Sequence, residues 1–115
     1  MTVAEVAARL DAATMTAIPV SRPVLGGYAS DLLSDVMANA REGDVWVTLQ
    51  KHVNVVAVAQ LVNLAAIVLV HGRKPDPDTV ARANEHGVPI LVTACSAFEA
   101  VGRLWESGLR GRGAP

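Results

Sequence analysis

Three short apolar runs decide the fold of this chain: Val45-Trp46-Val47-Thr48-Leu49, Ala66-Ile67-Val68-Leu69-Val70 and Pro89-Ile90-Leu91-Val92-Thr93. Their composition is typical of strands, and the second run is continuous enough for a strand covered on both faces. Residues 53–64 have the length and alanine content of a helix, and residues 76–87 have the end signals of one. Because strands and helices alternate with short connections, the sequence predicts a parallel sheet with crossover helices and hence the α/β class.

Two further helices are predicted on either side of these runs. Residues 31–41 place their apolar side chains on one face, begin with Asp31 as the capping residue and stop before a glycine. Ser96 and Glu99 form a capping box at the start of a last helix, which ends at Gly108.

The amino-terminal region is predicted to be a short helix followed by an extended segment. Thr2 and Glu5 form a capping box, and apolar residues then follow at helical spacing to a helix end near residue 13. Residues 14–27 contain β-branched residues between two prolines, which favours an edge strand or an irregular arm.

The length bounds the number of domains. A chain of 115 residues is long enough for one compact domain and too short for two ordinary ones. We expect residues 1–109 to form a single domain and residues 110–115 to be a disordered tail. The expected architecture is a three-layer, mostly parallel sheet of about four strands with crossover helices, a short N-terminal helix and an extended arm.

Composition excludes several classes of protein. The single cysteine, Cys95, cannot form an internal disulfide, so a reduced, cytoplasmic protein is expected. A formal net charge of −1 and 3% aromatic residues argue against nucleic-acid binding. Polar residues interrupt the most apolar stretch, residues 53–70, and the amino terminus lacks the pattern of a signal peptide, so neither a membrane span nor export is expected.

The loops that follow the strands are the expected ligand site, because ligands of open parallel sheets bind outside the carboxyl ends of the strands. These loops are polar, although surface loops are polar in any case. The candidate ligand-binding residues are Gly26, Gly27, Tyr28, Ser30, Asp31, Gln50, His52, Asn54, His71, Gly72, Thr93 and Ser96. An anionic or nucleotide-like small ligand is expected there. No cofactor is expected, because neither a Walker A sequence nor a dinucleotide fingerprint occurs.

Individual side chains in these loops leave alternatives open. His52 and His71 are either an acid and base, a pair of metal ligands, or ordinary loop histidines. Cys95 precedes a helix whose dipole would lower the thiol pKa, or it is a small buried apolar residue. Asp31 and Asp35 either share a metal ion or form a solvated polar face. No metal site is assigned to them.

The predicted helix 53–64 indicates a homo-oligomer. Gln60 and Asn63 form only a narrow polar edge on this helix, with Val56 between them. Because one sheet can cover only one face of a helix, we expect an apolar contact with a second subunit, most simply in a two-fold dimer. Burial under the amino-terminal arm is the alternative.

Residues 21–37, beginning Ser21-Arg22-Pro23-Val24-Leu25-Gly26-Gly27, together with residues 43–48 and 54–59, resemble the DRTGG domain family. Arg22 and the two glycines fit the naming motif. Ser21 and Leu25 replace an acidic residue and a threonine, which weakens a ligand role for those two positions. The resemblance covers roughly residues 20–109.

This resemblance implies an α/β module similar to the N-terminal domain of HPr kinase/phosphorylase and to modules beside CBS domains in inorganic pyrophosphatases or within phosphotransacetylases. In such proteins the module serves regulation or assembly, and the resemblance implies no catalytic residues. It also suggests a link to redox or carbon metabolism. The leading hypothesis is a stand-alone, non-catalytic regulatory or ligand-binding module. Its rival is a small enzyme that uses His52, His71 and Cys95.

Overall fold

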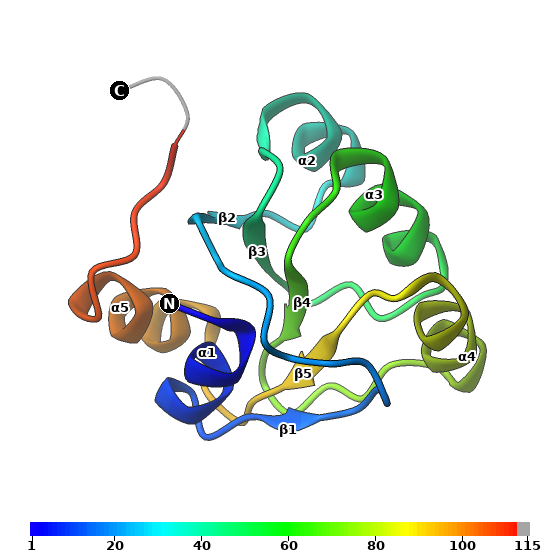
Figure 1. Cartoon of the computed structure of the whole chain (residues 1–115), viewed down its shortest axis with the longest axis horizontal. Coiled ribbons are helices and arrows are strands. Elements are labelled where there is room, and N and C mark those ends of the chain that lie inside the picture. Colours follow the sequence, from blue (N-terminus) through cyan, green and yellow to red (C-terminus); the bar gives the residue numbers. More distant parts are fainter. Residues whose placement is uncertain (113–115) are drawn as a thin grey trace.

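The computed structural model describes residues 1–112, which form three layers around one sheet (Figure 1). The strands are β1 (Ala13–Thr14), β2 (Gly26–Ala29), β3 (Asp44–Thr48), β4 (Ala66–Leu69) and β5 (Ile90–Val92). Their order in the sheet is β1-β5-β4-β3-β2, and only β1 runs antiparallel to its neighbour. The predicted α/β class with a mostly parallel sheet and crossover helices is confirmed.

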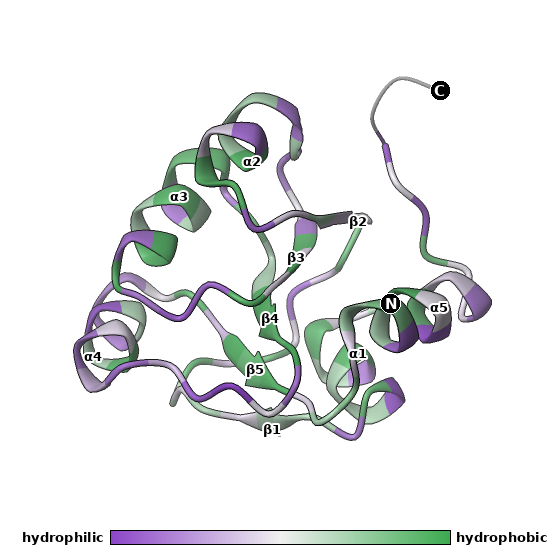
Figure 2. Cartoon of the chain, turned by 180° about the vertical axis from the view of Figure 1, so that it is seen from behind, coloured by the Kyte–Doolittle hydropathy of each residue, from purple (hydrophilic) through white to green (hydrophobic). Residues whose placement is uncertain are grey.

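Helices cover both faces of the sheet (Figures 1 and 2). One face carries α2 (Leu33–Asn39), α3 (Asn54–Val62) and α4 (Pro77–His86), and the other carries α1 (Val3–Arg9) and α5 (Ala97–Glu106). No helix within residues 1–112 is long and apolar enough to cross a bilayer.

The alternation of side chains along the central strands builds two cores. In β3, Val45 and Val47 pack into the cluster beneath α1 and α5, whereas Trp46 packs into the cluster beneath α2, α3 and α4. In β4, Val68 packs into the first of these clusters and Ile67 into the second. Burial on both faces explains why the runs are continuously apolar.

The first part of the chain differs from the prediction. The first helix ends at Arg9 because Asp11 adopts a positive φ of 48°, and residues 13–14 then form the short strand β1, which pairs with β5. Of the expected edge strand or arm of residues 14–27, Thr14 and the two glycines that begin β2 belong to strands of the sheet. The Met15 N–H also donates to the Ile90 carbonyl of β5 at 2.8 Å. The sheet thus has five strands.

The helix starts are largely as predicted. The Thr2 and Glu5 capping box is present in full. The Ser96 hydroxyl accepts a hydrogen bond from the Glu99 N–H, but the Glu99 carboxylate pairs with Arg103 and leaves the box half formed.

Neighbouring helices of the chain cover two sides of helix α3. It packs against α2 on one side and α4 on the other, and Val56 has an exposed fraction of 0%. The expectation that Val56 lies on the edge of the helix beside Gln60 and Asn63, available to a second subunit, was wrong, because it assumed that only the sheet covers this helix. A second subunit therefore cannot contact this helix through Val56.

The last described residues lie along β2. The Gly27 N–H donates to the Arg110 carbonyl at 3.1 Å, and Arg112 Nη2 lies 2.7 Å from Oδ1 of Asp44, whose side chain is 2% exposed. Residues 110–112, which make these two contacts, are part of the stretch that the sequence predicts to be a disordered tail. Residues 113–115 of that predicted tail lie outside the described part.

Candidate functional site

Backbone hydrogen bonds join the loops at the carboxyl edge of the sheet. The His71 N–H donates to the Cys95 carbonyl and the Gly72 N–H to the Thr93 carbonyl, both at 2.8 Å, which connects the loops after β4 and β5. The Asp76 N–H donates to the Lys51 carbonyl at 3.2 Å, which connects the loops after β3 and β4. Three of the predicted loops therefore lie side by side.

Asp76 connects two basic residues from the neighbouring loop. Its Oδ1 atom lies 3.0 Å from Lys51 Nζ, and its Oδ2 atom lies 2.8 Å from His52 Nδ1. Hydrogen bonds from His52 and then from Lys51 hold the pKa of the Asp76 carboxyl below its ordinary value. Asp76 occupies the N-cap position of α4, as predicted, but its side chain makes no capping hydrogen bond.

Basic side chains dominate this part of the edge. Residues 49–53 and 70–76 together carry five basic residues and one acidic residue. His71, Arg73 and Lys74 are exposed, and His71 and Gly72 turn the chain outward with φ values of 57° and 64°. Lys51, Arg73, Lys74 and Asp76 were not among the predicted site residues. The signal for them was a basic loop that ends in an N-cap aspartate.

Asp31 belongs to a separate cluster next to β3. Its Oδ1 atom accepts hydrogen bonds from Thr48 Oγ1 at 2.8 Å and from the Leu49 N–H at 2.7 Å. Gln50 Nε2 donates to the Asp31 carbonyl at 2.9 Å. The expectation that Asp31 caps a helix was wrong: α2 begins after Leu32, without a side-chain cap, because two donors at the end of β3 hold the carboxylate.

Asp35 contacts different groups from Asp31. The Tyr28 hydroxyl donates to Asp35 Oδ2 at 2.8 Å, and this hydrogen bond raises the pKa of Tyr28. Hydrogen bonds from Ser30 and then from Tyr28 lower the pKa of the Asp35 carboxyl. Within residues 1–112, no group of three or more acidic, histidine or cysteine side chains is placed to hold a metal ion.

The two glycines of the motif lie within a strand, not in a loop. Gly26 begins β2 at the amino edge of the sheet, away from the loops after β3, β4 and β5. A Cβ at Gly26 would come within 2.7 Å of Asp44 Oδ1 and 2.9 Å of the Arg110 carbonyl oxygen. The absence of a side chain at Gly26 therefore allows residues 110–112 to approach β2 closely. Its assignment, with Gly27 and Tyr28, to a loop after the first strand was wrong.

The remaining predicted residues have structural partners or lie at helix starts. Thr93 is buried, and its hydroxyl donates to the Leu10 carbonyl at 2.7 Å. Cys95 donates its N–H to Thr93 Oγ1, and its Sγ atom lies 4.0 Å from the same Leu10 carbonyl. Ser96 caps α5, and Asn54 is the exposed first residue of α3.

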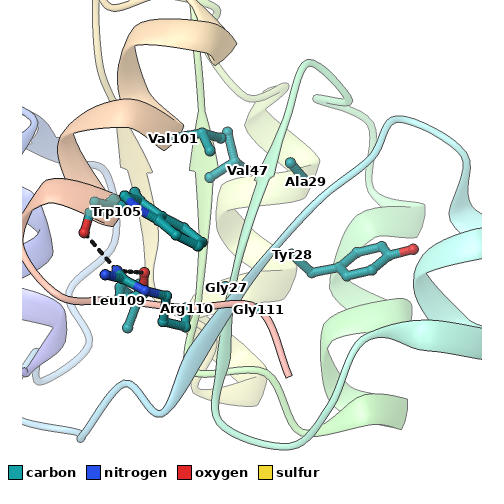
Figure 3. Close-up of a pocket in the computed structure, with 10 residues that line it drawn as sticks. Gly27, Tyr28, Ala29, Val47, Val101, Trp105, Leu109, Arg110 and Gly111 are labelled. Atoms are coloured by element: carbon teal, nitrogen blue, oxygen red, sulfur yellow. Dashed lines mark hydrogen bonds between the residues drawn. The ribbon is translucent and has the colours of Figure 1, made fainter. Parts of the chain in front are cut away.

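A hollow lies between β2 and α5 (Figure 3). Gly27, Tyr28 and Ala29 of β2 line it, and the Tyr28 ring points away from it. Val47 lines it from the sheet, and Trp105 from the helix. The Arg110 guanidinium lies over the Trp105 ring, 3.8 Å from its centre. Sequence reasoning missed this hollow because nothing in the sequence places α5 beside β2.

The fold resembles a solved regulatory structure. It matches the CBS and DRTGG domains of the regulatory region of Clostridium perfringens pyrophosphatase, complexed with the activator diadenosine tetraphosphate, with a TM-score of 0.71 and 13% sequence identity. The match covers 92% of this chain and 46% of that chain, so this chain spans about half the length of its structural neighbour. No protein-family model and no curated protein matches the sequence.

Proposed function

We propose that this chain is a DRTGG-like, non-catalytic regulatory module that binds a small anionic, nucleotide-like ligand at the carboxyl edge of β3 and β4. The observation that carries the proposal is the pair of joined loops with five basic residues and one acidic residue. The positive charges of Lys51, Arg73 and Lys74 attract phosphate groups, and the Asp76 carboxylate offsets one of them. The ligand class agrees with the structural neighbour, which was solved with a dinucleoside tetraphosphate.

The geometry assigns different roles to the residues of this edge. Asp76 orients Lys51 and His52, while Arg73 and Lys74 are exposed and free to turn toward a ligand. His71 and Gly72 shape the loop that carries these two cations. Asp31, Thr93 and Ser96 support the edge through their hydrogen bonds to the chain itself.

The rival function is a small enzyme, and one observation favours it. The His52 to Asp76 distance of 2.8 Å is that of a histidine base oriented by a carboxylate. A catalytic pair of this kind also needs a nucleophile within hydrogen-bond reach, and Cys95 Sγ has its hydrogen bond with the Leu10 carbonyl. We therefore favour binding over catalysis.

Thermal unfolding with a panel of anions tests the proposal. The probes are diadenosine tetraphosphate, ATP, AMP and inorganic pyrophosphate. A probe at 100 times its dissociation constant stabilises the native state by about 2.7 kcal/mol, which is a readily measured shift of Tm. We expect the double variant Arg73→Ala/Lys74→Ala to bind the stabilising probe with at least about tenfold lower affinity, because two positive charges are lost. Arg41→Ala/Arg82→Ala removes the same charge from exposed positions elsewhere and should leave binding intact.

Two results would count against this function. If none of the four probes raises Tm, or if both double variants weaken binding equally, the basic loops are not a specific site. Turnover of a bound probe that is lost in His52→Ala would favour the enzyme. A homo-oligomer, a cytoplasmic location and a link to redox or carbon metabolism are further proposals, and of these the assembly has the clearest structural correlate.

A further inference from the structure

Helix α5 leaves its largest apolar side chains in solvent. Phe98 is 92% exposed, Trp105 is 57% exposed and Val101 is 39% exposed. Their spacing puts them on one face of the helix, beside the buried Ala100 and Leu104 that anchor α5 to the sheet. Two of the four aromatic residues of the chain thus lie together at the surface. A contiguous apolar face of this kind marks an interaction surface.

Gly102 lies within the same exposed face and makes no close packing contact with the rest of residues 1–112. A glycine in the interior of a helix destabilises that helix relative to alanine. A Cβ at Gly102 would meet no atom within 4 Å, and Gly102 is not among the residues with a positive φ. Neither packing within residues 1–112 nor backbone geometry therefore requires a glycine here. The close approach of another backbone would require it.

The four residues of this face are arranged symmetrically along the helix. Phe98 and Trp105 are equally distant from the midpoint between Val101 and Gly102. If two copies of α5 cross antiparallel about a two-fold axis at this midpoint, Phe98 of each copy meets Trp105 of the other. In the same arrangement, Val101 of each copy fills the space above Gly102 of the other. The face is complementary to itself.

We infer that α5 forms the two-fold interface of a homodimer, with Phe98 packed against Trp105 of the second copy across Gly102. The inference rests on the proposed homo-oligomer and moves its interface from α3 to α5. A fully buried aromatic side chain covers about 150–250 Å². Because Phe98 is 92% exposed and Trp105 57% exposed, the four rings of two copies together supply roughly 600 Å² of exposed apolar surface. At an apolar share of about 65%, this corresponds to about 900 Å² in total, before Val101 and the helix flanks are added. A specific interface needs about 1,000 Å².

The dimer also accounts for the hollow beside α5. Val101 and Trp105 line both the hollow and the exposed face of the helix, and Arg110 lies at the rim over Trp105 (Figure 3). A second copy seated on α5 covers the mouth of this hollow. In contrast, the large exposed apolar residue of α3 is Leu61, which is 72% exposed and lies next to Gln60 and Asn63.

Light scattering at tens of micromolar tests the interface. The wild-type protein should have twice the chain mass of 12.0 kDa. Phe98→Glu places a charge on a side chain that is solvent-exposed in the single chain, so it should give a folded monomer with an unchanged circular dichroism spectrum. Leu61→Glu is the matched control on α3 and should remain dimeric. Dilution of the wild type should shift the emission of Trp105 to longer wavelength, while the buried Trp46 does not change.

Gly102→Leu separates a specific crossing from a merely adhesive surface. The substitution adds apolar area at a position where the single chain has free space. If the apolar face associates non-specifically, Gly102→Leu should raise the affinity of the two copies. If the helices cross as inferred here, the substitution should lower the dimer affinity at least about tenfold, because the second backbone cannot approach. A monomeric wild type would overturn both the homo-oligomer and this interface. A dimer that persists in Phe98→Glu, or that dissociates in Leu61→Glu, would overturn the interface alone.

Discussion

Arg22 holds the carboxyl end of α3 through Asn63, although 41 residues separate them in sequence. Arg22 Nη2 donates to the Asn63 carbonyl at 2.9 Å, and Nη1 donates to Asn63 Oδ1 at 3.1 Å. Asn63 adopts the left-handed conformation that ends the helix, with φ of 61°. The arginine that carries the resemblance to the DRTGG motif therefore has a structural role in this chain: it donates to the carbonyl groups of Asn63 and Leu64 just beyond the helix, and the Asn63 carbonyl also accepts the Gly43 N–H at 3.0 Å.

Replacing Arg22 should therefore destabilise the fold without touching the candidate ligand site. We expect Arg22→Ala to lower the free energy of unfolding by about 1–3 kcal/mol, the usual effect of removing a charged partner from hydrogen-bonded groups. Arg22→Lys should restore only part of the loss, because lysine cannot reproduce the planar fork of donors. Urea unfolding measures both variants. Full recovery by lysine would mean that charge alone matters here.

The two glycines of β2 should respond differently to alanine. A Cβ at Gly26 would overlap Asp44 Oδ1 at 2.7 Å and the Arg110 carbonyl oxygen at 2.9 Å, whereas a Cβ at Gly27 would make ordinary contacts at 3.6 Å or more. We expect Gly26→Ala to cost about 1–3 kcal/mol through displacement of the chain end. Gly27→Ala should change stability by less than about 0.5 kcal/mol. Equal effects of the two substitutions in urea unfolding would contradict this difference.

The central strands could be predicted from sequence because their environment repeats along each run. Burial on both faces requires an apolar residue at every position, and β3 and β4 show this directly. The edge strand β2 has no such signature, because its residues are Gly-Gly-Tyr-Ala and its position depends on pairing with β3 and on contacts with the chain end. Helix α3 was correctly placed, but its packing against α2 and α4 depends on how the crossovers lay these helices side by side on the sheet, which the pattern of α3 alone does not show.

The candidate site could be located only as an edge of the sheet. Topology brings the loops after parallel strands together, so the general position follows from the strand pattern. The role of each side chain depends on neighbours that are distant in sequence. Asp31 bonds the Leu49 N–H 18 positions away, and Thr93 bonds the Leu10 carbonyl 83 positions away. Sequence periodicity does not indicate such partners. Asp31 and Thr93 were therefore predicted as ligand-binding residues.

Asp76 should make stability depend on pH in the acidic range. Its folded pKa lies below the ordinary value of 3.8, first through the hydrogen bond from His52 and then through that from Lys51. Its contribution is therefore complete above the ordinary pKa and is lost as pH falls through the lower folded pKa. We expect Asp76→Asn to be less stable than the wild type at neutral pH, with the difference shrinking as the pH drops. Urea midpoints across this range measure it.

Asp78→Asn is the control for this pH dependence, because Asp78 lies two residues further along, in the first turn of α4. It should retain the acid-dependent loss seen in the wild type. If Asp78→Asn abolishes that loss and Asp76→Asn does not, the interaction with Lys51 and His52 is not its source.

Thr93 should prove to be a structural residue of the carboxyl edge and not a ligand contact. Its hydroxyl donates to the Leu10 carbonyl at 2.7 Å and accepts the Cys95 N–H at 3.2 Å, in a site that is closed to solvent. Thr93→Val keeps the shape and leaves both backbone groups without this partner, so we expect a loss of about 1–3 kcal/mol. Thr93→Ser keeps the hydroxyl and should lose less. If Thr93→Val instead weakens binding of a polyphosphate probe at unchanged stability, the hydroxyl belongs to the ligand site, because a structural bond would lower Tm with or without the probe.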